Sequence, residues 1–285
     1  MKISALIAAS LPFAMTALAA EKSGHADAEL IAGVASYQPG KTVPVGIKLK
    51  IEPGWHSYWV NPGEGGMPMS AKWTLPAGWK AGELKAPVPK RFKTGDLPGF
   101  GYEGEAIYRV DLTPPASAKG EAELKVKLSW LTCNESACVP GDVELSVKLT
   151  VGDGAAGKDA AVLVEAEKKI PQVSDKSPSL FVLEREGGRL FLALSNTSNP
   201  DLDLTGVKVF PASKNVVDAA DELTFSRIDF KNPVDIKETI GLGEESWFTF
   251  AKKSEYAEGP ATLLDIVLAG GKLERPLIVS WREKK

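Results

Sequence analysis

Leu124-Lys125-Val126-Lys127-Leu128-Ser129-Trp130 alternates apolar and polar side chains without a break, and this stretch decides the fold. A period of two places one row of side chains on a core and the other row in water, as in a strand of an antiparallel sheet. The same alternation recurs at 45–51, 106–112 and 143–151, with Gly- and Pro-rich stretches between the runs. Between residues 29 and 151 the sequence therefore predicts an antiparallel β-sandwich.

The sequence after residue 152 predicts a linker and a second β region. A run rich in Ala, Glu and Lys from Asp159 to Ile170 predicts a short helix, which Pro171 ends. Farther along the chain, apolar and alternating runs separated by turns predict strands at 180–183, 189–194, 207–210, 223–230, 247–251, 263–268 and 273–281.

Length and composition fit two domains of ordinary size. We expect a first domain at 21–152, a linker with a short helix at 153–178 and a second domain at 179–285, because 285 residues exceed what one small sandwich needs. The net charge of −3 gives no basic surface for nucleic acid or anionic lipid. The sequence shows no hydrolase triad, phosphate-binding loop or paired-carboxylate motif, and its second domain contains neither cysteine nor histidine.

The first twenty residues have the form of a secretory signal peptide. Lys2 precedes an apolar run from Ile3 to Leu18, which overlaps the small-residue cleavage site Ala17-Leu18-Ala19-Ala20. The run is shorter than the roughly 20 apolar residues that span a bilayer. We therefore expect residues 1–20 to be removed and the mature protein to be soluble in the periplasm.

Cys133 and Cys138 are the only two cysteines, and four residues separate them. An exported protein meets an oxidising compartment, so a disulfide between them is expected. A spacer of this length can bring the Cα atoms within the required distance of about 4.4–6.8 Å. Closing so short a loop stabilises a fold by only roughly 2 kcal/mol in the chain-entropy model, and strained short loops are easier to reduce. Spacing alone leaves a structural and an exchangeable disulfide equally open.

The loop between the cysteines gives no support to a strongly acidic thiol. Glu135 disfavours a nearby thiolate by like-charge repulsion, and the loop contains no Lys or Arg. The pair is therefore better suited to be attacked by the thiolate of another protein than to attack first.

Several motifs follow one another in order across residues 28–151. They are Gly54-Trp55-His56-Ser57-Tyr58-Trp59-Val60-Asn61-Pro62-Gly63, Gly66-Met67-Pro68, Trp73-Thr74-Leu75-Pro76-Ala77-Gly78-Trp79, Gly101-Tyr102-Glu103-Gly104-Glu105, and Trp130-Leu131-Thr132-Cys133 with Cys138-Val139-Pro140. Together they resemble the N-terminal periplasmic domain of DsbD, the transmembrane thiol:disulfide interchange protein, and of its relative ScsB. Two β domains joined by a short helix resemble the ScsB arrangement in particular. The resemblance implies an all-β protein of two immunoglobulin-like β-sandwich domains.

The resemblance also implies roles for individual residues. In that family a cysteine pair accepts electrons from a membrane-embedded domain and passes them to periplasmic thioredoxin-like partners. Cys133 and Cys138 would be this pair, and Cys138 would be the sulfur that bonds to partners. Phe100, Gly101 and Tyr102 would match the cap loop of the family, in which either Phe100 or Tyr102 covers the sulfurs with its ring.

Other residues near the cysteines are further candidates. Trp55 and Tyr58 match aromatic positions on the strand beside the pair. His56 could act there as an acid or base, although a histidine among aromatic residues is more often structural. Met67 and Met69 would form a soft ligand set for Cu(I) together with the cysteines and His56. Packing of both methionines against the core is the more ordinary interpretation.

We therefore expect a periplasmic thiol-disulfide oxidoreductase that uses its own disulfide and no cofactor. The sequence contains neither a transmembrane electron channel nor a thioredoxin domain, and its cysteine spacer is one residue shorter than in the best-known DsbD domains. The membrane-embedded thiol carrier and the thioredoxin-like partners are thus expected to be other proteins, with no nucleic acid partner and no direct membrane insertion. A non-enzymatic interaction module with an inert disulfide and a Cu(I)-binding copper-tolerance protein are the alternatives. The identity of donor and client, the role of the second domain and the oligomeric state do not follow from the sequence.

Overall fold

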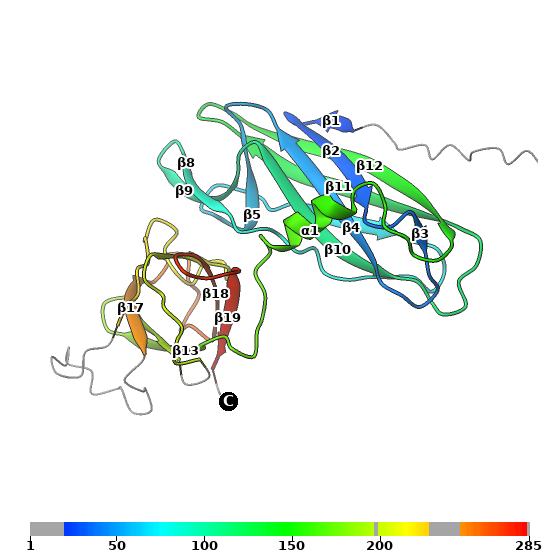
Figure 1. Cartoon of the computed structure of the whole chain (residues 1–285). Helices are drawn as coiled ribbons and strands as arrows, with labels where there is room; N and C mark the ends of the chain where they lie inside the picture. The colour runs from blue at the N-terminus through cyan, green and yellow to red at the C-terminus, as the bar shows by residue number, and fades with distance from the viewer. Residues whose placement is uncertain (1–19, 197–198, 228–245, 284–285) are drawn as a thin grey trace, which may run out of the picture.

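A computed structural model describes residues 20–196, 199–227 and 246–283. The expected signal peptide, apart from its last residue, lies outside these ranges. The described chain consists of β-strands and one short helix, which confirms the predicted all-β class (Figure 1). Within the described ranges, no helix has the length and hydropathy of a membrane span.

Two sheets formed by residues 21–151 pack face to face as an immunoglobulin-like sandwich (Figure 1). The first has the order β1-β2-β4-β10-β7, with strands at Glu21–Ser23, Ala26–Ala32, Val43–Ile51, Glu105–Thr113 and Lys80–Ala81. The second has the order β3-β12-β11-β5-β9-β8, with strands at Ser36–Tyr37, Cys138–Val151, Glu121–Cys133, His56–Gly63, Leu97–Tyr102 and Lys90–Thr94. A further strand, β6 (Ser70–Thr74), pairs with β11. The four runs predicted from alternation lie in β4, β10, β11 and β12.

The apolar row of β11 explains how the sandwich fixes the cysteine pair. Leu124, Val126, Leu128 and Trp130 are all 0% exposed in the core between the sheets. Each such buried side chain stabilises the fold by roughly 1.5–3 kcal/mol. A slip of one residue would turn this row outward, so core packing sets the register of β11. In that register β11 and β12 pair along their whole length and bring Cys133 directly opposite Cys138.

The helix α1 (Ala160–Glu167) follows the first sandwich and packs on it. It is shorter than the predicted 159–170, since the residue before a proline disfavours helical geometry and Pro171 follows Ile170. Leu163 is 2% exposed, and a Cβ built at Gly46 would lie 2.5 Å from its Cδ2 atom. The glycine therefore leaves the space on β4 that Leu163 fills.

Two further sheets build the second β region. One has the order β13-β14-β17-β16, with strands at Ser179–Arg185, Arg189–Ser195, Trp247–Lys252 and Ser226–Arg227. The other has the order β15-β18-β19, with strands at Val207–Pro211, Leu263–Gly270 and Leu277–Arg282. Of the predicted strand at 223–230, the described residues form only the short strand β16. Residues 228–230 lie outside the described ranges. The predicted strand at 273–281 begins only at Leu277. Leu273 lies in a turn, because its backbone N–H donates a hydrogen bond to the carbonyl of Gly270.

The two β regions touch through an apolar contact around Phe210 of β15. Its ring lies 6.5 Å from the ring of Trp59 and 6.3 Å from that of Phe100, edge to face in both pairs. Val267 and Ala269 of β18 belong to the same buried cluster. The second region thus covers one side of β5 and β9 in the first.

Candidate functional site

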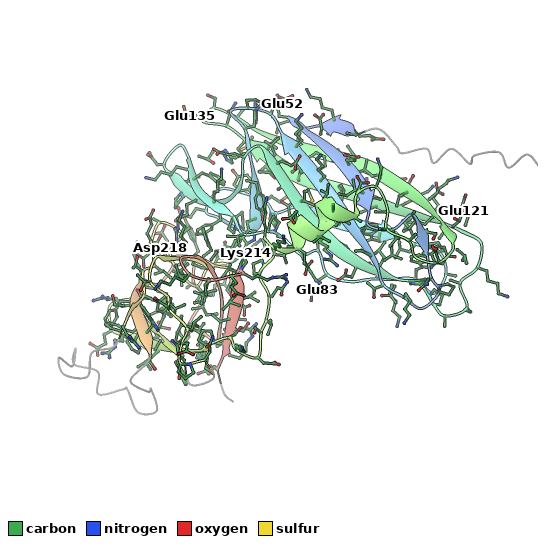
Figure 2. The ribbon with its side chains drawn as sticks, in the orientation of Figure 1. Glu52, Glu83, Glu121, Glu135, Lys214 and Asp218 are labelled. Atoms are coloured by element: carbon green, nitrogen blue, oxygen red, sulfur yellow. A yellow bond between two sulfur atoms is a disulfide. The ribbon has the colours of Figure 1, made fainter. Side chains whose placement is uncertain are left out.

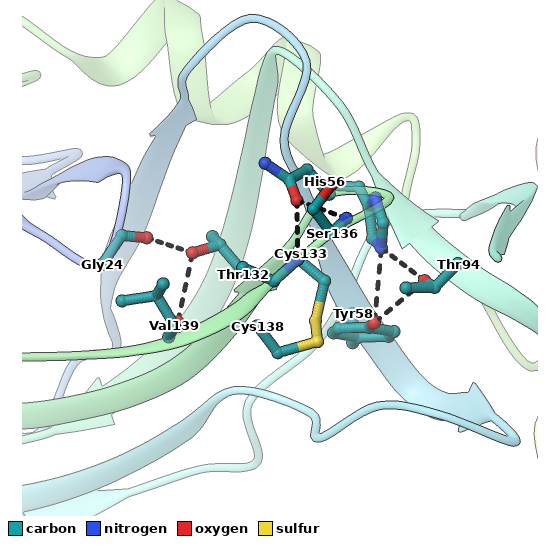
Figure 3. The surroundings of a disulfide bond; sticks show 11 residues. Gly24, His56, Tyr58, Thr94, Thr132, Cys133, Ser136, Cys138 and Val139 are labelled. Atoms are coloured by element: carbon teal, nitrogen blue, oxygen red, sulfur yellow. Dashed lines mark hydrogen bonds between the residues drawn. A yellow bond between two sulfur atoms is a disulfide. The ribbon is translucent and has the colours of Figure 1, made fainter.

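The hairpin between β11 and β12 carries both cysteines. A disulfide joins the side chains, as predicted, and the Cα atoms lie 4.1 Å apart, closer than the separation expected from the sequence (Figure 3). The Oδ1 atom of Asn134 accepts hydrogen bonds from the backbone N–H groups of Ser136 and Ala137, each 2.8 Å long. An Asn side chain bonded to its own backbone two or three residues on holds a tight turn. Figure 2 shows Glu135, from this loop, at the opposite end of the sandwich from Glu121 at the start of β11.

The two cysteines differ in exposure. Cys138 is exposed, whereas Cys133 is 0% exposed. Trp130 faces the core, and side chains alternate along a strand, so Cys133 lies on the outer face of the sheet. A side chain on an outer face is buried only where other groups cover it. Cys133 therefore lies beneath a cover that does not extend over Cys138.

β5 supplies the nearest part of this cover. His56 is directly opposite Cys133 in the β11–β5 ladder, and residues opposite one another share a face of the sheet. Tyr58, two residues along β5, lies on the same face. His56 is 7% exposed and Tyr58 1% exposed, although both are on the outer face (Figure 3). Of Trp55 and Tyr58, which were expected on the strand beside the pair, Tyr58 lies in β5, whereas Trp55 comes just before the strand begins.

Phe92 of β8 extends the cover from the next hairpin. Its ring centroid lies 4.0 Å from that of His56 and 5.5 Å from that of Tyr58. Cβ atoms built at Gly99 and Gly101 of β9 would lie 2.8 Å and 2.9 Å from atoms of the Phe92 ring. The two glycines therefore form the floor on which the ring lies. Phe92 was not among the residues predicted from the sequence, although the Gly-Phe-Gly spacing at 99–101 was a signal for such a contact.

Hydrogen bonds tie the tip of the β8–β9 hairpin to β5. His56 Nε2 lies 2.9 Å from Thr94 Oγ1 and 3.3 Å from the Tyr58 hydroxyl, which is also 3.3 Å from Thr94 Oγ1 (Figure 3). Burial lowers the pKa of His56 and raises the pKa of Tyr58, so both are neutral at neutral pH. Thr94, which the sequence analysis did not identify, thus holds the hairpin over the strand that faces Cys133.

The lowered pKa of His56 predicts a pH dependence of stability. The unfolded chain binds a proton at His56 near the ordinary pKa of about 6.5, whereas the folded chain binds it only at a lower pH. Neutral His56 therefore contributes its full stability above about pH 6.5, and this contribution declines as the pH falls from there towards the folded pKa.

We expect the free energy of unfolding to fall less between about pH 7 and pH 5 in His56→Gln than in the unchanged protein. Urea denaturation at a series of pH values measures this difference. Since the carboxylates titrate in both proteins, an equal pH dependence in the two would contradict the burial of a neutral His56.

The structure corrects the expectation that Phe100 or Tyr102 covers the sulfurs. On β9 their side chains alternate with Gly101, so they point away from the face that carries the disulfide. Phe100 is 0% exposed and packs edge to face on Trp59. The Tyr102 hydroxyl donates a 2.7 Å hydrogen bond to the carbonyl of Pro87. Of the three predicted cap residues, only Gly101 lies on the disulfide side, beneath Phe92.

Trp55, expected beside the cysteine pair, packs on His25. Its ring stacks on that of His25, with centroids 3.7 Å apart and planes at 8°. His25 Nδ1 lies 2.7 Å from a carboxylate oxygen of Glu52. Trp55 thereby fastens the turn before β2 to the turn before β5, next to the cysteine hairpin.

The methionines of the proposed Cu(I) set lie in different surroundings. Met69 is 7% exposed in the core cluster, whereas Met67 is 44% exposed. A Cβ built at Gly66 would lie 2.1 Å from the Tyr58 ring, so the loop before Met67 lies flat on that ring. Among the residues that the structure describes, no group of three or more His, Cys, Asp or Glu side chains could hold a metal ion.

Comparisons with known proteins agree with this geometry. Residues 27–150 match the sequence profile of the family described as thiol:disulfide interchange protein DsbD, N-terminal. The crystal structure of the N-terminal periplasmic domain of ScsB from Proteus mirabilis is similar over 90% of this chain and 93% of that chain, with a TM-score of 0.62 and 18% identity. No curated protein matches the chain in sequence. At this identity the structural likeness shows a shared fold, and it extends over both β regions.

Proposed function

We propose, from the match of residues 27–150 to the family of DsbD N-terminal domains, that the chain relays electrons through its Cys133–Cys138 disulfide. The electrons come from a membrane-embedded thiol carrier and pass to thioredoxin-like proteins of the periplasm. The observation that carries the proposal is the asymmetry of the pair, in which Cys138 is exposed and Cys133 is fully covered. A disulfide that only stabilised the hairpin would require neither an exposed sulfur nor a covered one.

The exposed sulfur defines the order of the exchange steps. A partner thiolate attacks Cys138 Sγ, the bond to Cys133 breaks, and Cys133 Sγ leaves with the electron pair. A second thiolate of the partner then attacks the partner's own sulfur in the mixed disulfide and releases Cys138. The partner becomes a disulfide and this chain becomes a dithiol, with two electrons transferred and two protons taken up by the released thiolates. The same steps in reverse reduce an oxidised acceptor.

The β11–β12 ladder prepares the chain for both redox states. Because core side chains of β11 set the register, the two cysteines stay opposite one another when the bond opens. The Asn134 side chain holds the loop by bonds that do not involve sulfur. Re-formation of the bond therefore requires little rearrangement of the backbone, as a repeated relay demands.

The reduction potential and direct electron transfer test this function. We expect a potential above about −300 mV, the value below which disulfides of secreted proteins are structural. Equilibration with dithiol–disulfide buffers measures it. We also expect the reduced protein to reduce a thioredoxin-like protein that carries a C-x-x-C disulfide, whereas a Cys133→Ala, Cys138→Ala double variant does not. A potential well below that value, with no transfer, would favour an interaction module with an inert disulfide.

A further inference from the structure

The β8–β9 hairpin has two faces with different partners. Phe92 and Thr94 point to the face that covers Cys133. Arg91 precedes Phe92 on β8 and so points to the other face, where it is opposite Phe100 of β9. Figure 1 shows this hairpin at the end of the first sandwich that lies next to the second β region. One strand thus contacts both the redox site and the second region.

The Arg91 side chain crosses from the first β region to the second. Its guanidinium donates hydrogen bonds of 2.9 Å, 2.9 Å and 3.3 Å to the backbone carbonyls of Ala219, Asp221 and Val209, respectively. It also lies 4.8 Å from the ring centroid of Phe100. Hydrogen bonds from a charged, partly buried donor are stronger than neutral ones, and the planar guanidinium can reach several acceptors at once.

The hairpin depends on such contacts because β8 is an edge strand. It is the last strand in the order of its sheet and pairs only with β9 among the described strands. Edge strands with few neighbours open at a lower free energy than central ones. Thr94 holds the tip of the hairpin to His56, and Arg91 holds its base to the second region.

A second contact between the regions does not involve the hairpin. Asn61 of β5 donates a 2.8 Å hydrogen bond from Nδ2 to the carbonyl of Pro211. Asn61 is 4% exposed and belongs to a strand inside the sheet. Its Oδ1 atom also accepts a hydrogen bond from the N–H of Gly63. Loss of the bond to Pro211 would weaken the contact between the regions while the three bonds of Arg91 to the second region stay in place, so Asn61 provides a control.

We propose that the second β region holds the β8–β9 hairpin over the disulfide, with Arg91 as the positioning residue. The proposal rests on the relay function, because a held cover matters only for a disulfide that exchanges. Separation of Arg91 from its three carbonyls frees the base of the hairpin. Phe92 can then leave His56 and Tyr58, which uncovers Cys133. The second region thereby sets how often the covered sulfur becomes accessible.

The rate at which a small aromatic disulfide reagent modifies the Cys133 thiol tests this proposal in the full chain carrying Cys138→Ser. This background is needed because the exposed Cys138 sulfur of the disulfide can be attacked without any opening of the cover. We expect Arg91→Ala in this background to react at least about tenfold faster than Cys138→Ser alone, a change equivalent to about 1.4 kcal/mol in the opening of the cover. Amide hydrogen exchange should speed up across residues 90–102 and stay slow in β4. Asn61→Ala in the same background should react at the rate of Cys138→Ser alone. Arg91→Lys keeps the charge but loses the planar fork, and should show a smaller change in the same direction.

Two outcomes would overturn the proposal. One is an unchanged rate of Cys133 modification and unchanged hairpin exchange in both Arg91 variants. The other is an equal acceleration in Asn61→Ala, which would show that contact between the regions in general, and not the hairpin, controls access. Neither readout uses a protein partner, so failure of electron transfer to thioredoxin-like proteins would contradict the relay while leaving this result intact.

Discussion

Cys133→Ser is expected to accumulate a mixed disulfide with a thioredoxin-like partner, whereas Cys138→Ser is not. The first variant keeps the exposed thiol and lacks the second sulfur that would resolve the intermediate. The second variant keeps only the thiol of Cys133, which is 0% exposed and lies opposite His56 of β5. A partner cannot approach that thiol until the cover opens.

The single thiols can be compared directly with a small aromatic disulfide reagent. If opening the cover costs about 3 kcal/mol, the thiol of Cys138→Ser reacts roughly 100-fold more slowly than that of Cys133→Ser. Both variants in denaturant serve as the control, because unfolding exposes either thiol and should bring the two rates together. Equal rates in the folded variants would show that Cys133 is not covered in solution, and the assignment of Cys138 as the attacked sulfur would fail.

The hairpin that carries the cysteines could be predicted because its causes are local. Alternation along β11 and β12 is visible in the sequence, and it fixes the register that brings the cysteines together. The spacing of the cysteines then limits the loop to a tight turn. For these strands, pattern and structure depend on the same apolar side chains, chiefly Leu124 to Trp130.

The cover could not be predicted in the same way. Whether Phe100 or Gly101 faces the disulfide depends on the register of β9, because a shift of one residue turns every side chain to the opposite face of the sheet. In the stretch 97–102, Phe100 and Tyr102 alternate with Gly99 and Gly101, but this alternation does not indicate which row faces the disulfide. Phe92 is identified only when β8 is paired with β9.

The contact between the two β regions is even harder to predict from the sequence. Arg91 is bound by three backbone carbonyls, and a carbonyl is present at every residue whatever its side chain. From its apolar side chain alone, Phe210 could equally be predicted to lie in the core of the second sandwich. A role for the second region therefore becomes visible only from the three-dimensional contacts.

Gly101→Ala is expected to give the second large effect, a loss of about 3 kcal/mol in the free energy of unfolding of the first region. The added Cβ would lie 1.9 Å from the carbonyl oxygen of Ser57 and 2.9 Å from the Phe92 ring. The first of these atoms belongs to the backbone of the neighbouring strand β5, which cannot move aside as a flexible side chain does. β9 must therefore separate from β5, and the floor beneath Phe92 is lost. Urea denaturation followed by tryptophan fluorescence measures the change.

Gly65→Ala is the matched control for this substitution. Its added Cβ would lie 2.9 Å from Cδ1 of Leu97, a side chain that is 44% exposed and free to turn into solvent. We expect its stability to stay within about 0.5 kcal/mol of the unchanged protein. Gly101→Ala should also speed the reaction of the Cys133 thiol in Cys138→Ser with a small disulfide reagent, because separation of β9 uncovers that sulfur. A Gly101→Ala protein that matches Gly65→Ala in both stability and Cys133 reactivity would mean that β9 does not lie against β5, and would contradict the proposed cover over Cys133.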